Sequence, residues 1–107
     1  MFTDNDWKLF KSKIADWQEH YMERLCCEYT EILGSGGNAS DRFWALEDRI
    51  KKDRKKSGVQ CNVTRSEMTF IMQELIRDNV VTQDDLKDFS DEFRETMQML
   101  TNGFDEN

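Results

Sequence analysis

The sequence predicts an all-α protein: a small four-helix bundle with a long first helix, formed by one domain over residues 1–107. Apolar residues recur every three or four positions in four separate stretches, which is the period of a helix. The chain contains no proline, and Thr, Ser, Asn or Gly residues flank each stretch. The one alternating stretch, Val59–Val63, has no second strand to pair with, so it cannot form a sheet.

The first predicted helix covers residues 4–33. Thr3 and Asp6 form an imperfect capping box before it, and the glycine-rich segment 34–37 ends it. A helix of this length is about 45 Å long at 1.5 Å per residue. We therefore expect it to form the spine of the bundle or to extend towards a partner. Its apolar stripe contains Trp7, Phe10, Ile14, Trp17, Tyr21, Leu25, Tyr29 and Ile32.

Three shorter helices follow, and we expect them to cover residues 40–56, 65–78 and 83–102. Asn38 or Ser40 caps the first of these. Thr64, with Glu67 three residues later, forms a capping box for the next. Thr82 caps the last, which has acidic residues in its first turn.

We expect a core that is rich in aromatic side chains. Six of them at helical spacing are predicted to be buried: Trp7, Trp17, Phe43, Trp44, Phe89 and Phe93. The inner face of the last helix is predicted to consist of Leu86, Phe89, Phe93, Met97 and Leu100. Residues 104–107 are predicted to be a frayed tail.

The composition excludes several classes of protein. The chain has 15 Lys and Arg residues against 22 Asp and Glu residues, a formal net charge of −7 and a mean hydropathy of −0.83. No stretch approaches the ~18 apolar residues that a membrane-spanning helix needs, and the acidic N-terminus does not fit a cleavable signal peptide. The aromatic content argues against disorder. We therefore expect a cytoplasmic protein.

The cysteines and the single histidine do not have the spacing of a metal site. Structural zinc sites prefer cysteine pairs separated by two to four residues, whereas Cys26 and Cys27 are adjacent and Cys61 is remote. An odd number of cysteines favours reduced thiols, of which we expect at least one to be buried. His20 is expected at the surface. We expect no metal and no cofactor.

The charge is divided along the chain. Residues 1–48 carry a net charge of −5, residues 49–63 of +5 and residues 64–107 of −7. A basic run is usually the solvated end of a helix, where it suits the negative end of the helix dipole. The alternative is a contact with phosphate or with a partner. The basic residues are Arg49, Lys51, Lys52, Arg54, Lys55 and Lys56.

The last predicted helix carries an acidic ridge, because positions 88, 91, 92 and 95 have the spacing of one helix face. Three interpretations stay open: a solvated face, a docking surface for a protein with a basic surface, and, less readily, a cation site. The six carboxylates in this region are Asp84, Asp85, Asp88, Asp91, Glu92 and Glu95.

No catalytic constellation can be assembled from the sequence. It contains no Ser/His/Asp set, no P-loop and no Gly-x-Gly-x-x-Gly motif. Small all-α nucleoside triphosphate pyrophosphohydrolases bind magnesium through two adjacent glutamates and a third one three residues on. Here Glu28 and Glu31 are three apart, but Tyr29 stands where the adjacent acid is needed. We expect that the protein is not an enzyme.

Four segments together carry a resemblance: Asp6–Phe10, Trp17–Met22, Arg42–Glu47 and Asp85–Ser90. In them the chain resembles short uncharacterised acidic helical proteins of Gram-positive bacteria and their mobile elements, some of which bear the label "multidrug transporter". The hydropathy contradicts that label for this chain. The resemblance implies a bacterial mobile-element setting. In addition, Leu75–Leu86 is similar to short bacterial helical hairpins, some of which mediate oligomerisation, with Asn79 in place of the usual turn glycine.

These observations predict a non-enzymatic accessory or inhibitor protein that binds a protein partner with a basic surface. The sharper hypothesis is an anti-CRISPR protein whose acidic surface mimics nucleic acid and occupies the cleft of a CRISPR effector nuclease. One alternative is a self-associating regulator or scaffold, such as a homodimer held by the long helix. The other is weak binding of nucleic acid through residues 49–56. No membrane contact is expected.

Overall fold

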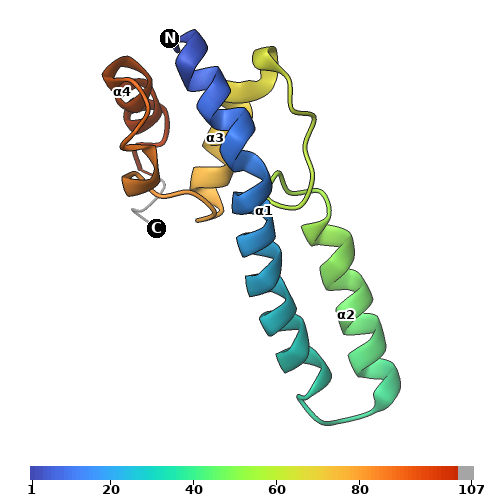
Figure 1. Ribbon diagram of the computed structural model, residues 1–107. Coiled ribbons are helices and arrows are strands. Elements are labelled where there is room, and N and C mark those ends of the chain that lie inside the picture. Colours follow the sequence, from blue (N-terminus) through green and yellow to red (C-terminus); the bar gives the residue numbers. More distant parts are fainter. Residues whose placement is uncertain (104–107) are drawn as a thin grey trace.

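The structure, a computed structural model that describes residues 1–103, is all-helical (Figure 1). Its α-helices are α1 (Asp4–Leu33), α2 (Ala39–Asp53), α3 (Met68–Arg77) and α4 (Asp91–Leu100). Two short 3-10 helices, η1 (Arg65–Glu67) and η2 (Asp84–Leu86), lie before α3 and α4. The described residues contain no strand. The predicted all-α class and the small bundle of four helices are confirmed. The predicted frayed tail, residues 104–107, lies outside the described residues.

The helix α1 begins and ends at the residues that the sequence predicts. Its capping box is complete, because the Asp6 N–H donates to Thr3 Oγ1 at 3.0 Å and the Thr3 N–H donates to Asp6 Oδ2 at 2.9 Å. After Gly34, both Gly36 and Gly37 adopt a φ of +83°, which a side chain would disfavour. The chain reverses there and enters α2 (Figure 1).

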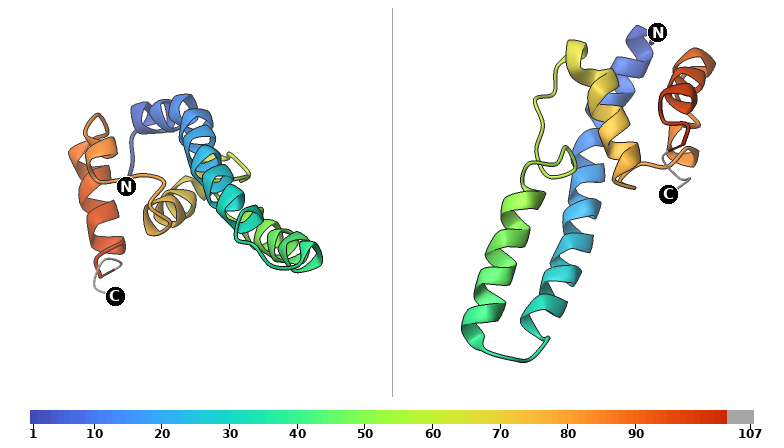
Figure 2. Two further views of the ribbon diagram at one scale, coloured as in Figure 1. Left: turned by 90° about the horizontal axis from the view of Figure 1, so that it is seen from below. Right: turned by 180° about the vertical axis from the view of Figure 1, so that it is seen from behind.

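The hydrophobic core lies at the N-terminal end of α1, where its first half packs with α3, η2 and α4 (Figures 1 and 2). Trp7 and Trp17 are half-buried against this core, and the Trp17 ring stacks on Phe89 with ring centroids 6.5 Å apart. Phe89 and Phe93 are buried as predicted, whereas the predicted burial of Trp7 and Trp17 is met only in part. The buried cluster consists of Phe10, Ile14, Met68, Ile71, Met72, Leu75, Val81, Leu86, Phe89, Phe93 and Met97.

A buried carboxylate joins α1 to α4. Asp6 is fully buried; its Oδ1 accepts a hydrogen bond from the Ser90 N–H at 2.8 Å and its Oδ2 accepts one from the Ser90 hydroxyl at 2.6 Å. Ser90 in turn caps α4 by accepting the Phe93 N–H at 3.2 Å. Burial alone would raise the pKa of the Asp6 carboxyl, but the hydrogen bonds from Ser90 and Thr3 outweigh it and hold the pKa below its ordinary value.

The second half of α1 and the whole of α2 form an antiparallel helical hairpin that extends away from the core (Figures 1 and 2). We call residues 18–60 the arm. Tyr21 and Leu25 are buried inside it. Gly58 lies so close to the Tyr21 ring that a Cβ at this position would come within 2.4 Å of Cδ2. The molecule is therefore elongated, with dimensions of 52 × 28 × 19 Å.

Two predicted helix boundaries are wrong. The helix α2 ends at Asp53 rather than at residue 56, because the chain turns back onto α1, where the Gln18 side chain donates to the Ser57 carbonyl at 2.9 Å. The helix α3 begins at Met68 rather than at residue 65. The expected capping box does not form there, because Thr64 makes no side-chain capping bond and residues 65–67 form η1 instead.

The predicted fourth helix is wrong in its first half. The turn η2 is only three residues long, residues 87–90 leave the helical path, and α4 starts after its own cap at Ser90. The predicted helix cap at Thr82 is wrong, because η2 begins after Gln83, which makes no side-chain capping bond. Thr82 and Asp85 instead hydrogen-bond each other across this turn: the Thr82 N–H and hydroxyl donate to the Asp85 carboxylate at 2.8 and 3.0 Å, and the Asp85 N–H donates to Thr82 Oγ1 at 3.3 Å. Leu100, which was predicted on the inner face, is exposed.

Candidate functional site

The predicted acidic ridge does not exist as one helix face. Asp84 and Asp85 belong to η2, Asp88 lies in the connection, and Asp91, Glu92 and Glu95 belong to α4. The helical spacing predicted for positions 88, 91, 92 and 95 fails because the chain leaves the helix before residue 91. All six carboxylates are exposed, so they form a broader acidic surface at one end of the molecule.

Three of the six carboxylates have structural partners. Asp85 accepts hydrogen bonds from the N–H and the hydroxyl of Thr82. Asp91 forms an ion pair with Arg94, and Glu92 accepts a hydrogen bond from the N-terminal ammonium at 2.6 Å. The other three, Asp84, Asp88 and Glu95, make no hydrogen bond through their side chains and no ion pair with another residue of the described chain. Their negative charge is free to meet a basic surface.

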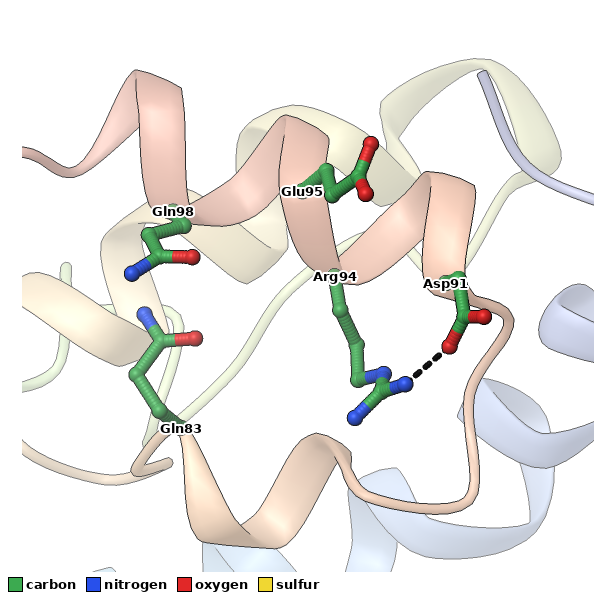
Figure 3. Close-up of a pocket in the computed structure, with 5 residues that line it drawn as sticks. All are labelled: Gln83, Asp91, Arg94, Glu95 and Gln98. Atoms are coloured by element: carbon green, nitrogen blue, oxygen red, sulfur yellow. Dashed lines mark hydrogen bonds and ion pairs between the residues drawn. The ribbon is translucent and has the colours of Figure 1, made fainter.

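A polar hollow of about 270 Å³ lies between η2 and α4 (Figure 3). Figure 3 shows the Arg94 side chain extending from α4 into this gap, where it meets Asp91, and the Gln83 and Gln98 side chains pointing towards one another. The fifth lining residue, Glu95, lies on α4 beside them. The hollow thus presents both hydrogen-bond donors and hydrogen-bond acceptors, which suits a polar contact with another molecule.

Arg49, the first residue of the predicted basic site, is part of the structure of the arm. Its guanidinium forms an ion pair with Glu28 of α1, lies 3.0 Å from Asp53 Oδ2 and stands 5.8 Å from the centre of the Tyr29 ring. The hydrogen bond with Glu28 and the charge of Asp53 raise the pKa of Arg49 above its ordinary value, because together they outweigh the lowering effect of burial. Arg49 therefore joins α2 to α1, and its charge is already paired with two carboxylates.

The rest of the predicted basic site is only partly free. Lys51 pairs with Glu47 at 3.1 Å, and Lys56 is half-buried. Lys52, Arg54 and Lys55 are exposed and form no ion pair within residues 1–103. The predicted basic site is thus divided: Arg49 joins the two helices of the arm, whereas Lys52, Arg54 and Lys55 lie at the solvated end of α2.

Tyr29 and Asp53, together with Glu28 and Arg49, form a cluster of four side chains that we call the clamp. The Tyr29 hydroxyl donates a hydrogen bond to Asp53 Oδ2 at 2.6 Å, and Asp53 is buried. Burial together with this hydrogen bond raises the pKa of Tyr29 well above its ordinary value. Because Tyr29 and Glu28 come from α1 and Arg49 and Asp53 from α2, the four side chains hold the two helices of the arm together.

The strongest departure from the predicted core lies on the arm. Phe43 and Trp44 were predicted to be buried, but their exposed fractions are 61% and 60%. The two rings contact each other edge to face, with centroids 4.8 Å apart. They are exposed because, within residues 1–103, α1 is the one helix on which α2 packs, so only one side of α2 is covered (Figure 1). Leu33 and Ile50 are also large exposed apolar side chains of the arm.

One flank of the arm is apolar along its length. Two shallow hollows lie on it. One is lined by residues of both helices and of the segment after α2, and the other by residues of α2 together with Arg54; Ile50 and Arg54 line both. Leu33 continues this flank on α1, since it follows Tyr29 by four residues. We call this surface the arm face and define it as Met22, Cys26, Tyr29 and Leu33 of α1, Phe43, Leu46, Glu47 and Ile50 of α2, Arg54 directly after α2, and Trp44, whose ring contacts that of Phe43.

Sequence reasoning missed the arm face, although a signal was present. The side of α2 that meets α1 carries Arg42, Leu46, Arg49 and Asp53, spaced by three and four residues. Only one of these residues is apolar. A helix that buries such a stripe must leave most of its apolar side chains exposed.

The thiols and the histidine do not form a metal site. Cys26, Cys27 and His20 are exposed, and Cys61 is half-buried, so the prediction of a buried thiol is met only in part. Burial raises the pKa of the Cys61 thiol. Within residues 1–103 no three His, Cys, Asp or Glu residues lie together in a way that could hold a metal ion. Over the same residues, no helix has the length and apolarity to span a bilayer.

Comparison with known proteins returns no relative. No protein-family model matches the chain, and neither a curated protein nor a solved structure matches it.

Proposed function

We propose that this protein acts by binding another protein through the arm face. The observation that carries the proposal is the exposure of Phe43 and Trp44 on a helix that has one neighbouring helix in the described part of the chain. Contiguous exposed apolar surface is uncommon on monomeric proteins and marks sites of interaction. Aromatic side chains are also enriched where interfaces carry most of their binding energy.

The arm is suited to binding because it is held in one shape before a partner arrives. The clamp of Glu28, Tyr29, Arg49 and Asp53 fixes α2 on α1. Gly58 allows the chain to pack closely on Tyr21 at the end of the arm nearest the core. Ordering flexible segments on binding costs free energy, so a pre-formed hairpin retains more of the energy of its contacts. This mode of binding uses one face of a helix pair against an apolar groove or another helix pair.

The proposal can be tested with a photo-crosslinker placed on the arm. Trp44 is replaced by p-benzoylphenylalanine, and the cells that make the protein are irradiated. We expect a discrete covalent adduct. The matched control carries the same group at Lys8, an exposed position of α1 at the far end of the molecule. If position 44 gives no adduct above that of position 8, the arm face is not a binding surface.

A second candidate function uses the acidic surface of η2 and α4. It is supported by Asp84, Asp88 and Glu95, which are exposed and carry negative charge that no other residue of the described chain neutralises by an ion pair. The partner would be a protein with a basic surface. In its sharpest form, the protein is an accessory or inhibitor of a mobile element that blocks a CRISPR effector nuclease by imitating nucleic acid.

This second candidate has a direct assay. Purified protein is added to guide-loaded CRISPR effector nucleases and their DNA target, and we expect cleavage to fall. The triple variant D84K/D88K/E95K should lose this inhibition, whereas F43E, on the arm, should retain it. Full cleavage in the presence of the unmodified protein would remove the candidate function, and full inhibition by the triple variant would remove the site.

A further inference from the structure

We infer that the arm face binds a second copy of this chain, with the two arms antiparallel about a two-fold axis. The inference rests on the proposed function and names its partner. A two-fold pair requires a surface that complements itself, because each residue pair across such an interface occurs twice. The arm face meets this requirement in shape, in overall charge and in the placement of single charges.

The shape of the arm face is self-complementary. A projecting aromatic pair, Phe43 with Trp44, stands near the tip of the arm. The hollow between the two helices lies nearer the core and contains Met22 and Val59. When two arms pair antiparallel, the tip of each lies beside the end of the other that is nearer the core. The aromatic pair of each copy is then positioned to fill the hollow of the other, so both exposed features are covered together.

The overall charge of the arm also selects an antiparallel copy. Residues 18–60 contain eight acidic and eight basic residues, so the arm is neutral in a chain of net charge −7. Residues 27–48, which form the tip, contain five acidic residues and one basic residue. Residues 18–26 and 49–60, which form the end nearer the core, contain three acidic and seven basic residues. Antiparallel pairing places the acidic tip of each copy against the basic end of the other, whereas parallel pairing would oppose like charges.

Single charges on the arm face fit the same arrangement. Glu47, which also pairs with Lys51 of its own helix, precedes Ile50 by three residues, and Arg54 follows Ile50 by four. When the two copies of α2 cross antiparallel at Ile50, Glu47 of each copy comes opposite Arg54 of the other. The two symmetric ion pairs lie at the edge of the apolar contact, where they set the register more than they add affinity.

The size of the arm face fits a weak, reversible dimer. The 15 residues of α2 make a helix about 22 Å long, and two packed helices are about 20 Å wide. The flat projection is then about 450 Å² per copy, and a corrugated surface buries more than its projection. Standard interfaces bury about 800 Å² per partner. We therefore expect dissociation in the micromolar range.

Self-association is measured by sedimentation velocity over protein concentrations from the low micromolar to the submillimolar range. We expect a monomer–dimer equilibrium that weakens as salt is raised, because antiparallel arms attract one another. F43E should weaken the dimer at least tenfold. The matched control is F70E, since Phe70 of α3 is similarly exposed, at 56%, and lies outside the arm. A monomer at every concentration, or equal effects of the two variants, would overturn the inference.

The antiparallel register has its own test in charge reversal. The single variants E47K and R54E should each weaken the dimer, because each places like charges opposite one another twice. The double variant E47K/R54E exchanges the charges across the interface and should restore the affinity. Failure of the double variant to recover contradicts the proposed register. Circular dichroism measures whether each variant keeps its helices, which we expect because Arg54 is exposed and Glu47 is only half-buried.

The adjacent cysteines provide a footprint of the arm face. Cys26 lines the hollow between the helices, whereas Cys27 is its exposed neighbour about 100° further round α1. A C27S/C61S variant reports Cys26 alone, and a C26S/C61S variant reports Cys27 alone. As the protein concentration rises through the dissociation constant, alkylation of Cys26 by iodoacetamide should slow several-fold and that of Cys27 should not change. Equal behaviour of the two thiols would place the contact elsewhere.

Failure of this inference is distinguishable from failure of the proposed function. If the protein remains monomeric while the photo-crosslinker at position 44 gives an adduct of another mass, the arm face binds a different protein and the second copy is excluded. An adduct of twice the mass of the chain supports the dimer. If neither experiment gives a contact at the arm face, both proposals fall.

Discussion

Replacing Asp6 with Asn is expected to loosen the attachment of α4 to α1. The carboxylate accepts three hydrogen bonds within 3.0 Å, from the Thr3 N–H, the Ser90 N–H and the Ser90 hydroxyl. An amide in its place has a single oxygen and an NH₂ group. The NH₂ group meets the Thr3 N–H donor directly, whereas the Ser90 hydroxyl can rotate and accept from it.

The expected cost follows from these contacts. A hydrogen bond to a charged group contributes about 1.5–3 kcal/mol, and a buried donor left without a partner costs about 1–3 kcal/mol. Loss of the Thr3 contact and weakening of the Ser90 contacts together should lower the free energy of unfolding by about 2–4 kcal/mol. For a domain of this size the melting temperature should fall by about 10–25 °C.

Urea and thermal unfolding of D6N measure this change, with D4N as the matched control. Asp4 lies two residues away in the same helical turn, and its carboxylate pairs with Arg65 at the surface. D4N should change stability much less, because exposed ion pairs contribute little. A D6N protein as stable as D4N would refute the role assigned to the buried carboxylate.

The pH dependence provides a second check on Asp6. Its pKa in the folded protein lies below the ordinary value, so the carboxylate adds stability at pH values above that ordinary value, about 4. This contribution is lost as the pH falls through the lower pKa of the folded state. The difference between the unmodified protein and D6N should therefore be constant near neutrality and shrink in acid. A difference that grows in acid would contradict the assignment.

Three further changes test the core and the arm. F93A should cost about 3–5 kcal/mol in urea unfolding, because a fully buried ring leaves a cavity, and a loss below about 1 kcal/mol would show that α4 packs differently. G58A should cost about 1–3 kcal/mol, since its Cβ would stand 2.4 Å from the Tyr21 ring; unchanged stability would mean that this close contact is absent. Y29F should cost about 1–2 kcal/mol through the lost hydrogen bond to Asp53. Because the pKa of Tyr29 is raised on folding, its stabilising effect should be present below pH ~10 and fade above it; an ordinary tyrosinate titration would contradict this.

The sequence predicts α1 best because local chemistry determines both of its ends. Thr3 and Asp6 satisfy each other's backbone groups at the start, and the glycines after Leu33 release the chain at the end. Neither signal depends on the rest of the molecule. The predicted helix start at Thr64 is wrong because a capping box forms only when the following residues are α-helical, and residues 65–67 form a 3-10 helix instead.

The break before α4 could not be found from hydrophobic spacing. Leu86, Phe89, Phe93 and Met97 are all buried, and their steps of three and four residues continue through η2 and the connection. These four side chains are buried because they pack against α1 and α3, and this packing does not require that the backbone between them be helical. A local signal existed in Ser90, because a serine followed by two acids is typical of a helix start.

The candidate site could be predicted only in part, because exposure depends on neighbours that a single sequence does not reveal. The acidic residues were found, since charge can be read directly, but their grouping on one helix was wrong. Phe43 and Trp44 have the spacing of core residues, and nothing local shows that α2 has one neighbour rather than two. Arg49 is the opposite case: it belongs to a residue type usual at the surface, yet it is half-buried between the helices of the arm by its ion pairs with Glu28 and Asp53.

The continuity of α1 has a mechanical consequence. Its first half is packed in the core and its second half forms one helix of the arm, so a rotation of the helix about the buried Phe10 moves the whole arm. From Phe10 to Leu33 is about 35 Å at 1.5 Å per residue. A tilt of only 10° at the packed end would displace the tip of the arm by about 6 Å. Small changes of packing around Asp6 and α4 would therefore produce a much larger displacement of the tip of the arm.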